Sequence, residues 1–240
     1  MVNMVHLPRR YRRTLTVVTL LTLSLIVTSA ATSAAAVSGV VVALWHMDEQ
    51  PGASVMVDSS GFNHGGAIGA VTLGLASDDG STAYGFTGKG LVRVPHAADL
   101  NPGSQSLAIS AHVLVPANLA NGDYNLLEKG VATTTGGAYK MEIFGVSTSS
   151  HFGYPDCAFN GLNGHNRVYG PFKIADGKWH HVVCNLTATQ AFVTVDDTSG
   201  PKVARQVDTI VNTSDLTIGG KPNNTHYYLG LADEISITIG

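Results

Sequence analysis

Residues 178–195 read KWHHVVCNLTATQAFVTV, and this stretch organises the rest of the chain. Two runs rich in β-branched and aromatic residues flank a short polar turn, which is the pattern of a β-hairpin. Gly177 precedes the hairpin and the pair Asp196-Asp197 follows it, so turn-forming residues stand at both ends. The sequence therefore predicts two paired antiparallel strands in this stretch.

The first 36 residues have the features of a secretory signal peptide. Four arginines lie within residues 9–13, residues 15–27 are mostly apolar, and Ala34-Ala35-Ala36 offers small residues for cleavage. An uncleaved membrane anchor is the alternative, but the apolar run is short for a span of about 20 residues. We therefore expect a secreted, extracellular protein with no membrane insertion after cleavage.

Removal of this segment changes the charge of the chain. All four arginines leave, so residues 37–240 keep 10 of the 14 basic residues against 17 acidic ones, a formal net charge of −7. Contacts between basic side chains and phosphates supply most of the non-specific affinity for nucleic acid. We therefore expect no binding to nucleic acid or to anionic membranes.

The rest of the sequence is dominated by short strand-like runs separated by Gly-rich turns, and no stretch shows sustained helical periodicity. Besides the hairpin, the predicted strands cover residues 40–49, 84–86, 90–95, 107–116, 124–130, 138–144, 155–159, 167–169, 216–220 and 229–239. This pattern favours one all-β domain over residues 37–240, built as two packed sheets.

Five segments carry a family pattern in a fixed order. They are W-x-x-D-E at 45–49 with D-S-S-G at 58–61, Y-x-F at 84–86 with V-x-V-P at 92–95, L-A-I-S-A-H-V at 107–113, D-G-x-W-H-H-V at 176–182, and D-E-I at 233–235. Together they resemble the laminin G-like domains of the concanavalin A-like lectins and glucanases. His112 departs from that pattern, because tryptophan is usual there. The resemblance implies an antiparallel jelly-roll sandwich of two sheets.

The chain has two cysteines, Cys157 and Cys184, and both lie in strand-like runs. In an exported protein, two cysteines are most simply explained as a disulfide. The alternative is a pair of metal thiolates, but no third cysteine and no C-x-x-C spacing supports it. We therefore predict a Cys157–Cys184 disulfide.

No motif predicts catalysis. Glycoside hydrolysis by the usual route needs two carboxyl groups about 5–9 Å apart, and the glucanases that the chain resembles carry E-x-D-x-x-E, which is absent here. The acidic residues instead form adjacent pairs at 48–49, 78–79, 196–197 and 233–234, and neighbours on a strand point to opposite faces. We expect a non-catalytic protein. The alternatives are a polysaccharide-active hydrolase or lyase and a purely structural surface module.

Calcium is the cofactor that the resemblance implies. Calcium takes six to eight oxygen ligands, and the predicted ligands are Asp58, within a loop of hydroxyls, Asn63 and glycines, and Asp233 in the closing strand. The alternative is that Asp58 caps a turn and Asp233 accepts hydrogen bonds from neighbouring backbone.

Adjacent His180 and His181 face opposite ways on a strand, so we expect them to be structural.

Residues 223–228, NNTHYY, form the loop best suited to a carbohydrate. Sugar faces stack on aromatic rings, and sugar hydroxyls need polar partners. We therefore predict that Tyr227 and Tyr228 stack on a sugar and that Asn223 and Asn224 bind its hydroxyls. A carbohydrate is the expected ligand, and an extracellular protein is the second candidate.

Overall fold

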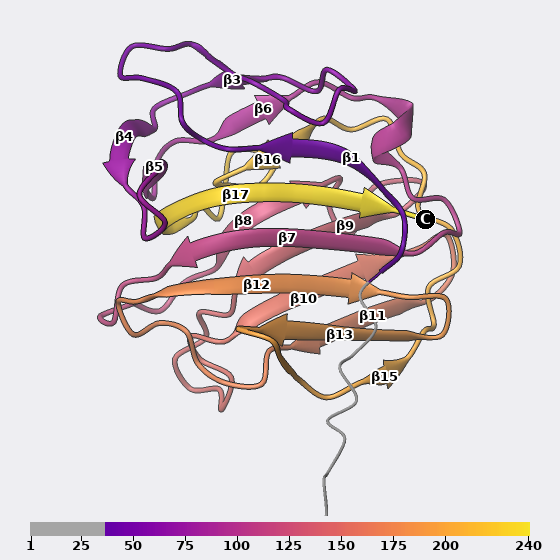
Figure 1. Ribbon diagram of the computed structural model, residues 1–240. Coiled ribbons are helices and arrows are strands. Elements are labelled where there is room, and N and C mark those ends of the chain that lie inside the picture. The colour runs from indigo at the N-terminus through magenta and orange to yellow at the C-terminus, as the bar shows by residue number, and fades with distance from the viewer. Residues whose placement is uncertain (1–36) are drawn as a thin grey trace, which may run out of the picture. The chain divides into compact units, whose positions relative to one another are not determined.

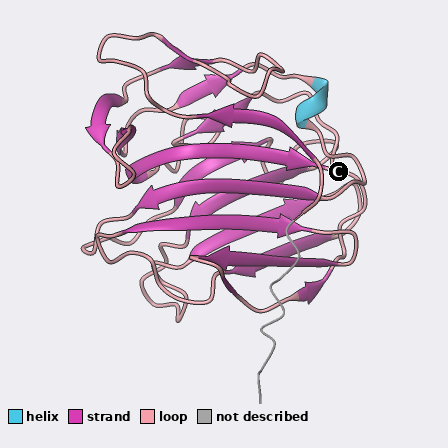
Figure 2. Ribbon diagram, viewed as in Figure 1, coloured by secondary structure: helices cyan, strands magenta, loops and turns pink. Residues whose placement is uncertain are grey.

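The computed structural model describes residues 37–240. The predicted signal peptide, residues 1–36, lies outside the described residues. The described part consists of β-strands with one 3-10 helix, η1 (Ala98–Leu100) (Figures 1 and 2). No helix in this part is long and apolar enough to cross a membrane.

The strands coincide with all the predicted segments and include several that were not predicted, namely β2 to β4, β14 and β15. In chain order they are β1 (Val40–Trp45), β2 (Val55–Met56), β3 (Gly66–Ile68), β4 (Thr72–Ala76), β5 (Thr82–Thr87), β6 (Val92–Val94), β7 (Leu107–Leu114), β8 (Tyr124–Lys129), β9 (Ala138–Ile143), β10 (Pro155–Asn160), β11 (His165–Tyr169), β12 (Trp179–Leu186), β13 (Gln190–Val195), β14 (Thr198–Ser199), β15 (Val203–Ala204), β16 (Leu216–Ile218) and β17 (Leu229–Ile239).

These strands form two antiparallel sheets, which confirms the predicted sandwich (Figure 1). The nine-stranded sheet has the order β14-β13-β12-β7-β17-β5-β4, with β1 also paired to β17 and β15 to β13. The eight-stranded sheet has the order β11-β10-β9-β8-β16-β6-β3-β2. Several neighbours are far apart in sequence, such as β7 and β12, β7 and β17, and β8 and β16, so residues from distant segments meet on each face.

The predicted hairpin is β12 and β13, joined by the turn 187–189. Along β12 every second side chain faces the core, and Val182, Cys184 and Leu186 are fully buried. β12 also pairs along its whole length with β7, opposite residues 107–114. The hairpin is thus joined to the middle of the nine-stranded sheet.

The core lies between the sheets and includes the fully buried rings of Trp45, Tyr84, Tyr139 and Phe159. Burying a large apolar side chain stabilises a fold by about 1.5–3 kcal/mol.

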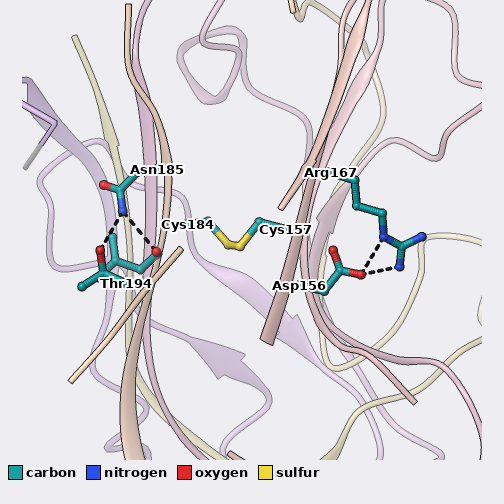
Figure 3. Close-up of a disulfide and its surroundings, with 7 residues drawn as sticks. Asp156, Cys157, Arg167, Cys184, Asn185 and Thr194 are labelled. Atoms are coloured by element: carbon teal, nitrogen blue, oxygen red, sulfur yellow. Dashed lines mark hydrogen bonds and ion pairs between the residues drawn. A yellow bond between two sulfur atoms is a disulfide. The ribbon is translucent and has the colours of Figure 1, made fainter. Parts of the chain in front are cut away.

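The predicted disulfide is confirmed. It joins Cys157 on β10 to Cys184 on β12, with 5.8 Å between the Cα atoms, and so links the two sheets through the core (Figure 3).

The strands β1 and β17 pair in the nine-stranded sheet. Val40 lies opposite Ile239 and Trp45 lies opposite Ile235, with one irregularity between Val41 and Ala43. The beginning of β1 and the end of β17 therefore lie side by side (Figure 1).

Candidate functional site

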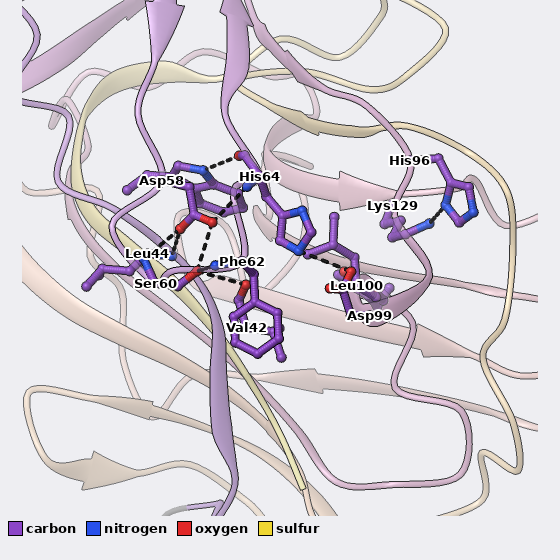
Figure 4. Close-up of polar contacts among 12 residues, drawn as sticks. Val42, Leu44, Asp58, Ser60, Phe62, His64, His96, Asp99, Leu100 and Lys129 are labelled. Carbon is purple, nitrogen blue, oxygen red and sulfur yellow. Dashed lines mark hydrogen bonds and ion pairs between the residues drawn. The ribbon is translucent and has the colours of Figure 1, made fainter.

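Asp58, one of the predicted calcium ligands, accepts hydrogen bonds from the protein itself. Oδ1 accepts the backbone N–H groups of Leu44 and Ser60, both at 2.9 Å, and Oδ2 accepts the Ser60 hydroxyl and the His64 N–H, both at 2.8 Å (Figure 4). Burial raises the pKa of Asp58, but these hydrogen bonds outweigh it and lower the pKa below its usual value. A calcium ion at this carboxylate would have to displace donors that tie the loop to β1.

Asp233, the other predicted calcium ligand, is fully buried at a bulge in β17. Its Oδ1 accepts the N–H of Glu234 at 2.9 Å, and its Oδ2 accepts the hydroxyl of Ser81 at 3.1 Å. Burial raises its pKa. Asp58 and Asp233 share no hydrogen-bond partner, and no three His, Cys, Asp or Glu side chains gather as a metal site within residues 37–240. The two carboxylates do not fit one calcium site as they stand, and calcium binding stays a prediction.

Tyr228, expected to stack on a sugar, is fully buried. Its ring packs edge-on against Phe86 at 5.7 Å between centroids, and its hydroxyl donates to the carbonyl of Leu231 at 3.2 Å. The prediction of Tyr228 as a ligand contact is therefore wrong. Tyr227 and Tyr228 are neighbours, and the chain turns the second of the two rings into the core.

The other predicted ligand residues lie on the surface. Asn223 and Asn224 are exposed and Tyr227 is half-buried. Asn224 Oδ1 accepts a hydrogen bond from Arg93 on β6 at 3.2 Å, and Tyr227 forms a backbone bridge with Asn125 on β8. The loop thus adjoins the outer face of the eight-stranded sheet.

That outer face carries two rows of mostly polar side chains, because residues between the core-facing Tyr139, Met141 and their counterparts point outward. The strand register places the first row directly opposite one another as Arg93, Thr217, Glu128, Lys140, Ala158 and Arg167. The second row is Asn125, Glu142, Asp156 and Tyr169.

Arg167 connects the two rows. Its Nε donates to Asp156 Oδ2 at 2.8 Å, and its Nη2 donates to the same oxygen (Figure 3). Nη2 also donates to Glu142 Oε1 at 2.8 Å. The guanidinium carbon lies 5.0 Å from the ring centroid of Phe144 and 5.7 Å from that of Tyr169. Two carboxylates and two rings therefore fix a cation whose side chain remains 41% exposed.

Four half-buried rings contact one another beside this cation, and two of them, Phe144 and Tyr169, contact it directly. His151 stacks on Tyr169 with 4.1 Å between centroids and 15° between planes, Phe144 meets Tyr169 edge-on at 5.4 Å, and Tyr154 meets His151 edge-on at 5.5 Å. We call Arg167, Phe144, His151, Tyr154 and Tyr169 the Arg167 site. It combines partly exposed rings with hydrogen-bond donors held in place.

The carboxylates within these rows are nearly inaccessible, since Glu128 is 3% exposed, Glu142 2% and Asp156 0%. Burial raises the pKa of Glu128 to about 7 and also raises the pKa of Asp156, which Arg167 partly offsets. Lys140 Nζ pairs with Glu142 Oε2 at 2.6 Å. The carboxylates act here as partners that orient Arg167 and Lys140.

The sequence did not predict this arrangement, because the carboxylates that form it are far apart in the chain. Glu128, Glu142 and Asp156 come from three successive strands and meet only through the register of β8, β9 and β10. A signal was present, since charged residues stand at alternate positions within apolar strands, as in K-M-E at 140–142. The pairing register of the strands decides which of these charged side chains lie opposite one another, and the sequence alone does not give that register.

Comparison with known proteins agrees with this fold. A laminin G family model, described as the concanavalin A-like lectin/glucanases superfamily, matches residues 86–238. No curated protein matches the chain significantly.

Several solved structures have a similar fold. The binding domain of Paraclostridial Mosquitocidal Protein 1 aligns at 13% identity and a TM-score of 0.60, over 83% of this chain and 48% of that one. Domain 4 of AbnA, a GH43 extracellular arabinanase from Geobacillus stearothermophilus, was solved with arabinotriose. It aligns at 15% identity and a TM-score of 0.57, over 84% of this chain and 93% of that one. Domains LG4-5 of the mouse laminin alpha1 chain align at 20% identity and a TM-score of 0.51, over 65% of this chain and 41% of that one. The chain thus spans about half the length of the toxin domain.

Proposed function

Because the chain belongs to the concanavalin A-like lectin/glucanase superfamily, with a laminin G-like fold, we propose that it is a secreted, non-catalytic module that binds carbohydrate at the Arg167 site. The observation that carries this proposal is the partly exposed guanidinium of Arg167, held between two carboxylates and two rings.

The chemistry of the Arg167 site suits a sugar. An aromatic ring offers an apolar face for the C–H groups of a pyranose or furanose, and a guanidinium offers a planar set of N–H donors for hydroxyl groups. Asp156 and Glu142 hold Arg167 in place before a ligand arrives, which lowers the entropic cost of binding. Positive and negative groups stand close together here, so the proposed ligand is a neutral carbohydrate.

Asn223, Asn224 and Tyr227 extend the same proposal. Arg93, which contacts Asn224, opens the row of residues that ends at Arg167. Arg93, Lys140 and Arg167 are the partly exposed side chains of this row, and a ligand of several sugar units that bridges them would reach both the Arg167 site and the loop. We therefore propose that the module prefers oligosaccharides and polysaccharides to single sugars.

Two further observations support a secreted binding module. The disulfide is typical of oxidising compartments, and the basic, apolar and small-residue segments before position 37 match the pattern expected of a signal peptide. Among structures of similar fold, the Geobacillus domain was solved with arabinotriose, and others are described as binding domains. These likenesses are below 25% identity and define no ligand.

A polysaccharide hydrolase or lyase is the second candidate, because Glu142 and Asp156 lie opposite each other on β9 and β10. A general acid or base must reach the substrate, but both carboxylates are buried and bonded to Arg167. The proposal therefore expects binding without release of reducing ends. Reducing ends released by the wild type but not by Glu142→Gln would favour the enzyme.

The test is binding of the purified protein to a broad glycan and polysaccharide array, with calcium and again with a chelator. We expect Tyr169→Ala to weaken binding by tenfold or more, about 1.4 kcal/mol. Tyr169 is a cleaner test than Arg167, whose loss would leave two buried carboxylates without a partner. Phe62→Ala is the matched control, because Phe62 is a 41% exposed ring outside the Arg167 site.

The possible outcomes of the array test the roles of calcium, of the Arg167 site and of carbohydrate as the ligand. Binding that is lost with the chelator would assign calcium to recognition, and binding in both conditions would remove it. A Tyr169→Ala variant that binds as well as the wild type would reject the Arg167 site. No binding to any glycan would reject the carbohydrate proposal in favour of a protein ligand or a structural role.

A further inference from the structure

Lys129, the last residue of β8, is fully buried and faces the core side of the eight-stranded sheet beside Leu216 and Tyr139. Its ammonium contacts Asn212 Oδ1 at 3.0 Å and the backbone carbonyl oxygens of Asn212 at 3.3 Å and Ser214 at 2.9 Å. It also contacts His96 Nδ1 at 3.3 Å (Figure 4). These contacts are carbonyls and an imidazole, without a carboxylate among them. A buried ammonium held in this way is costly.

The side-chain amide of Asn212 is fixed on both sides. Asn212 is only 3% exposed. Its Oδ1 accepts the backbone N–H of Ser214 at 3.0 Å as well as Lys129, and its Nδ2 donates to the carbonyl of Gly137 at 2.9 Å. Asn101 exchanges two further hydrogen bonds with the Asn212 backbone, at 3.1 and 3.2 Å. The amide therefore stays next to the amine.

We propose that Lys129 and Asn212 join in an intramolecular isopeptide bond. The neutral Nζ of Lys129 attacks Cγ of Asn212, so that a C–N bond forms and the bond from Cγ to Nδ2 breaks. The proton released by Nζ passes to His96 Nδ1 and then to Nδ2, which leaves as ammonia. One amine and one amide give one new amide and ammonia, without an oxidant or cofactor.

Each contact has a part in this reaction. The Ser214 N–H points at Oδ1, where negative charge develops in the tetrahedral intermediate, and a fixed donor there stabilises the transition state. His96 Nδ1 lies within reach of the proton on Nζ. Nζ donates a hydrogen bond to Asn212 Oδ1 at 3.0 Å, so the amine and the amide that it attacks are in direct contact.

Burial also supplies the reactive form of the amine. Desolvation lowers the pKa of Lys129 to about 8, although the charge of Asp215 opposes the shift. Because an ordinary lysine has a pKa of about 10.4, a far larger share of Lys129 is unprotonated near neutral pH. The new amide would lie away from water and would resist hydrolysis.

The test is mass spectrometry of the purified protein with its disulfide reduced, followed by peptide mapping. We expect loss of about 17 Da, the mass of ammonia, and a branched peptide that joins Lys129 to Asn212. Lys129→Met and Asn212→Ala should keep the full mass. Asn185→Ala is the matched control, because it removes an equally buried asparagine on β12 in the other sheet and leaves Lys129, Asn212 and their contacts in place, so the loss should remain.

Peptide mapping of the wild type decides the proposal even if a variant fails to fold. An unmodified Lys129 and an intact Asn212 side chain in the folded wild type would overturn it. Loss of ammonia located at any other residue would overturn it as well. Replacement of His96 by alanine should slow formation of the bond by roughly 10²-fold or more, if His96 transfers the proton.

Discussion

Asp58 is a residue whose charge serves the fold. The change Asp58→Asn keeps the shape but turns one acceptor oxygen into a donor, which faces the N–H and O–H donors now bonded to the carboxylate. We expect unfolding in urea to show a loss of about 1–3 kcal/mol, in calcium and in chelator alike. Asp123→Asn, at an exposed residue, is the control and should change stability little.

Unfolding in urea with calcium and with chelator also tests whether Asp58 is a calcium ligand. If calcium stabilises the wild type but not Asp58→Asn, then Asp58 is a ligand and its present hydrogen bonds must rearrange. If calcium stabilises neither protein, the calcium prediction is wrong.

Glu128 should make stability depend on pH. Burial raises its pKa from 4.5 to about 7 in the folded protein, so the folded state holds a proton that the unfolded state releases. The resulting stability is complete below pH 4.5 and is lost as the pH rises to 7, by about 3 kcal/mol. Glu128→Gln is neutral throughout, and its free energy of unfolding should fall less between pH 5 and pH 8. Equal slopes for both proteins would show that Glu128 does not cause the effect.

Among the elements, β10 and β12 depend on each other through the disulfide. In the chain-entropy model, a cross-link with a sequence separation of 27 residues stabilises a fold by about 3–4 kcal/mol. We expect urea unfolding to show a loss of this size when a reductant is added to the wild type. A variant with both cysteines replaced by alanine should have the lower free energy of unfolding from the outset, and the reductant should not change it. A reductant that leaves wild-type stability unchanged would contradict this.

The strands predicted from the sequence are those with continuous apolar or β-branched runs, such as the hairpin at 178–195 and the closing strand β17. β4 was not predicted, because its segment T-L-G-L-A has a glycine at its centre. Gly74 has a φ of +74°, and a Cβ there would lie 3.2 Å from the ring of Pro51. Such a strand is defined by its neighbours, and its own residues give little indication of it.

The candidate site was predicted less well than the fold. Loop residues such as Asn223 and Asn224 are identified by local composition, and they do lie on the surface. Arg167 and Glu142 are 25 residues apart, and the register of β9, β10 and β11 brings them together. Tyr227 and Tyr228 are alike in sequence, and packing alone decides which of the two rings is buried.

The proposed binding face and the buried structural contacts lie in different parts of the molecule. The outer face of the eight-stranded sheet carries the Arg167 site, whereas the disulfide lies in the core and Lys129 and Asn212 lie buried beneath the same sheet. A rigid sheet lets rings and donors keep their places without a ligand, and binding then needs little rearrangement.

The pairing of β1 with β17 determines how the molecule responds to mechanical force. Val40 and Ile239 lie side by side at the same end of an antiparallel pair. Tension applied through these two residues would separate the strands one hydrogen bond after another, as a zipper opens, because the load never acts along the strands in opposite directions. The sandwich would therefore release its outermost pairing at low force, while the disulfide-linked strands β10 and β12 carry no load at that stage.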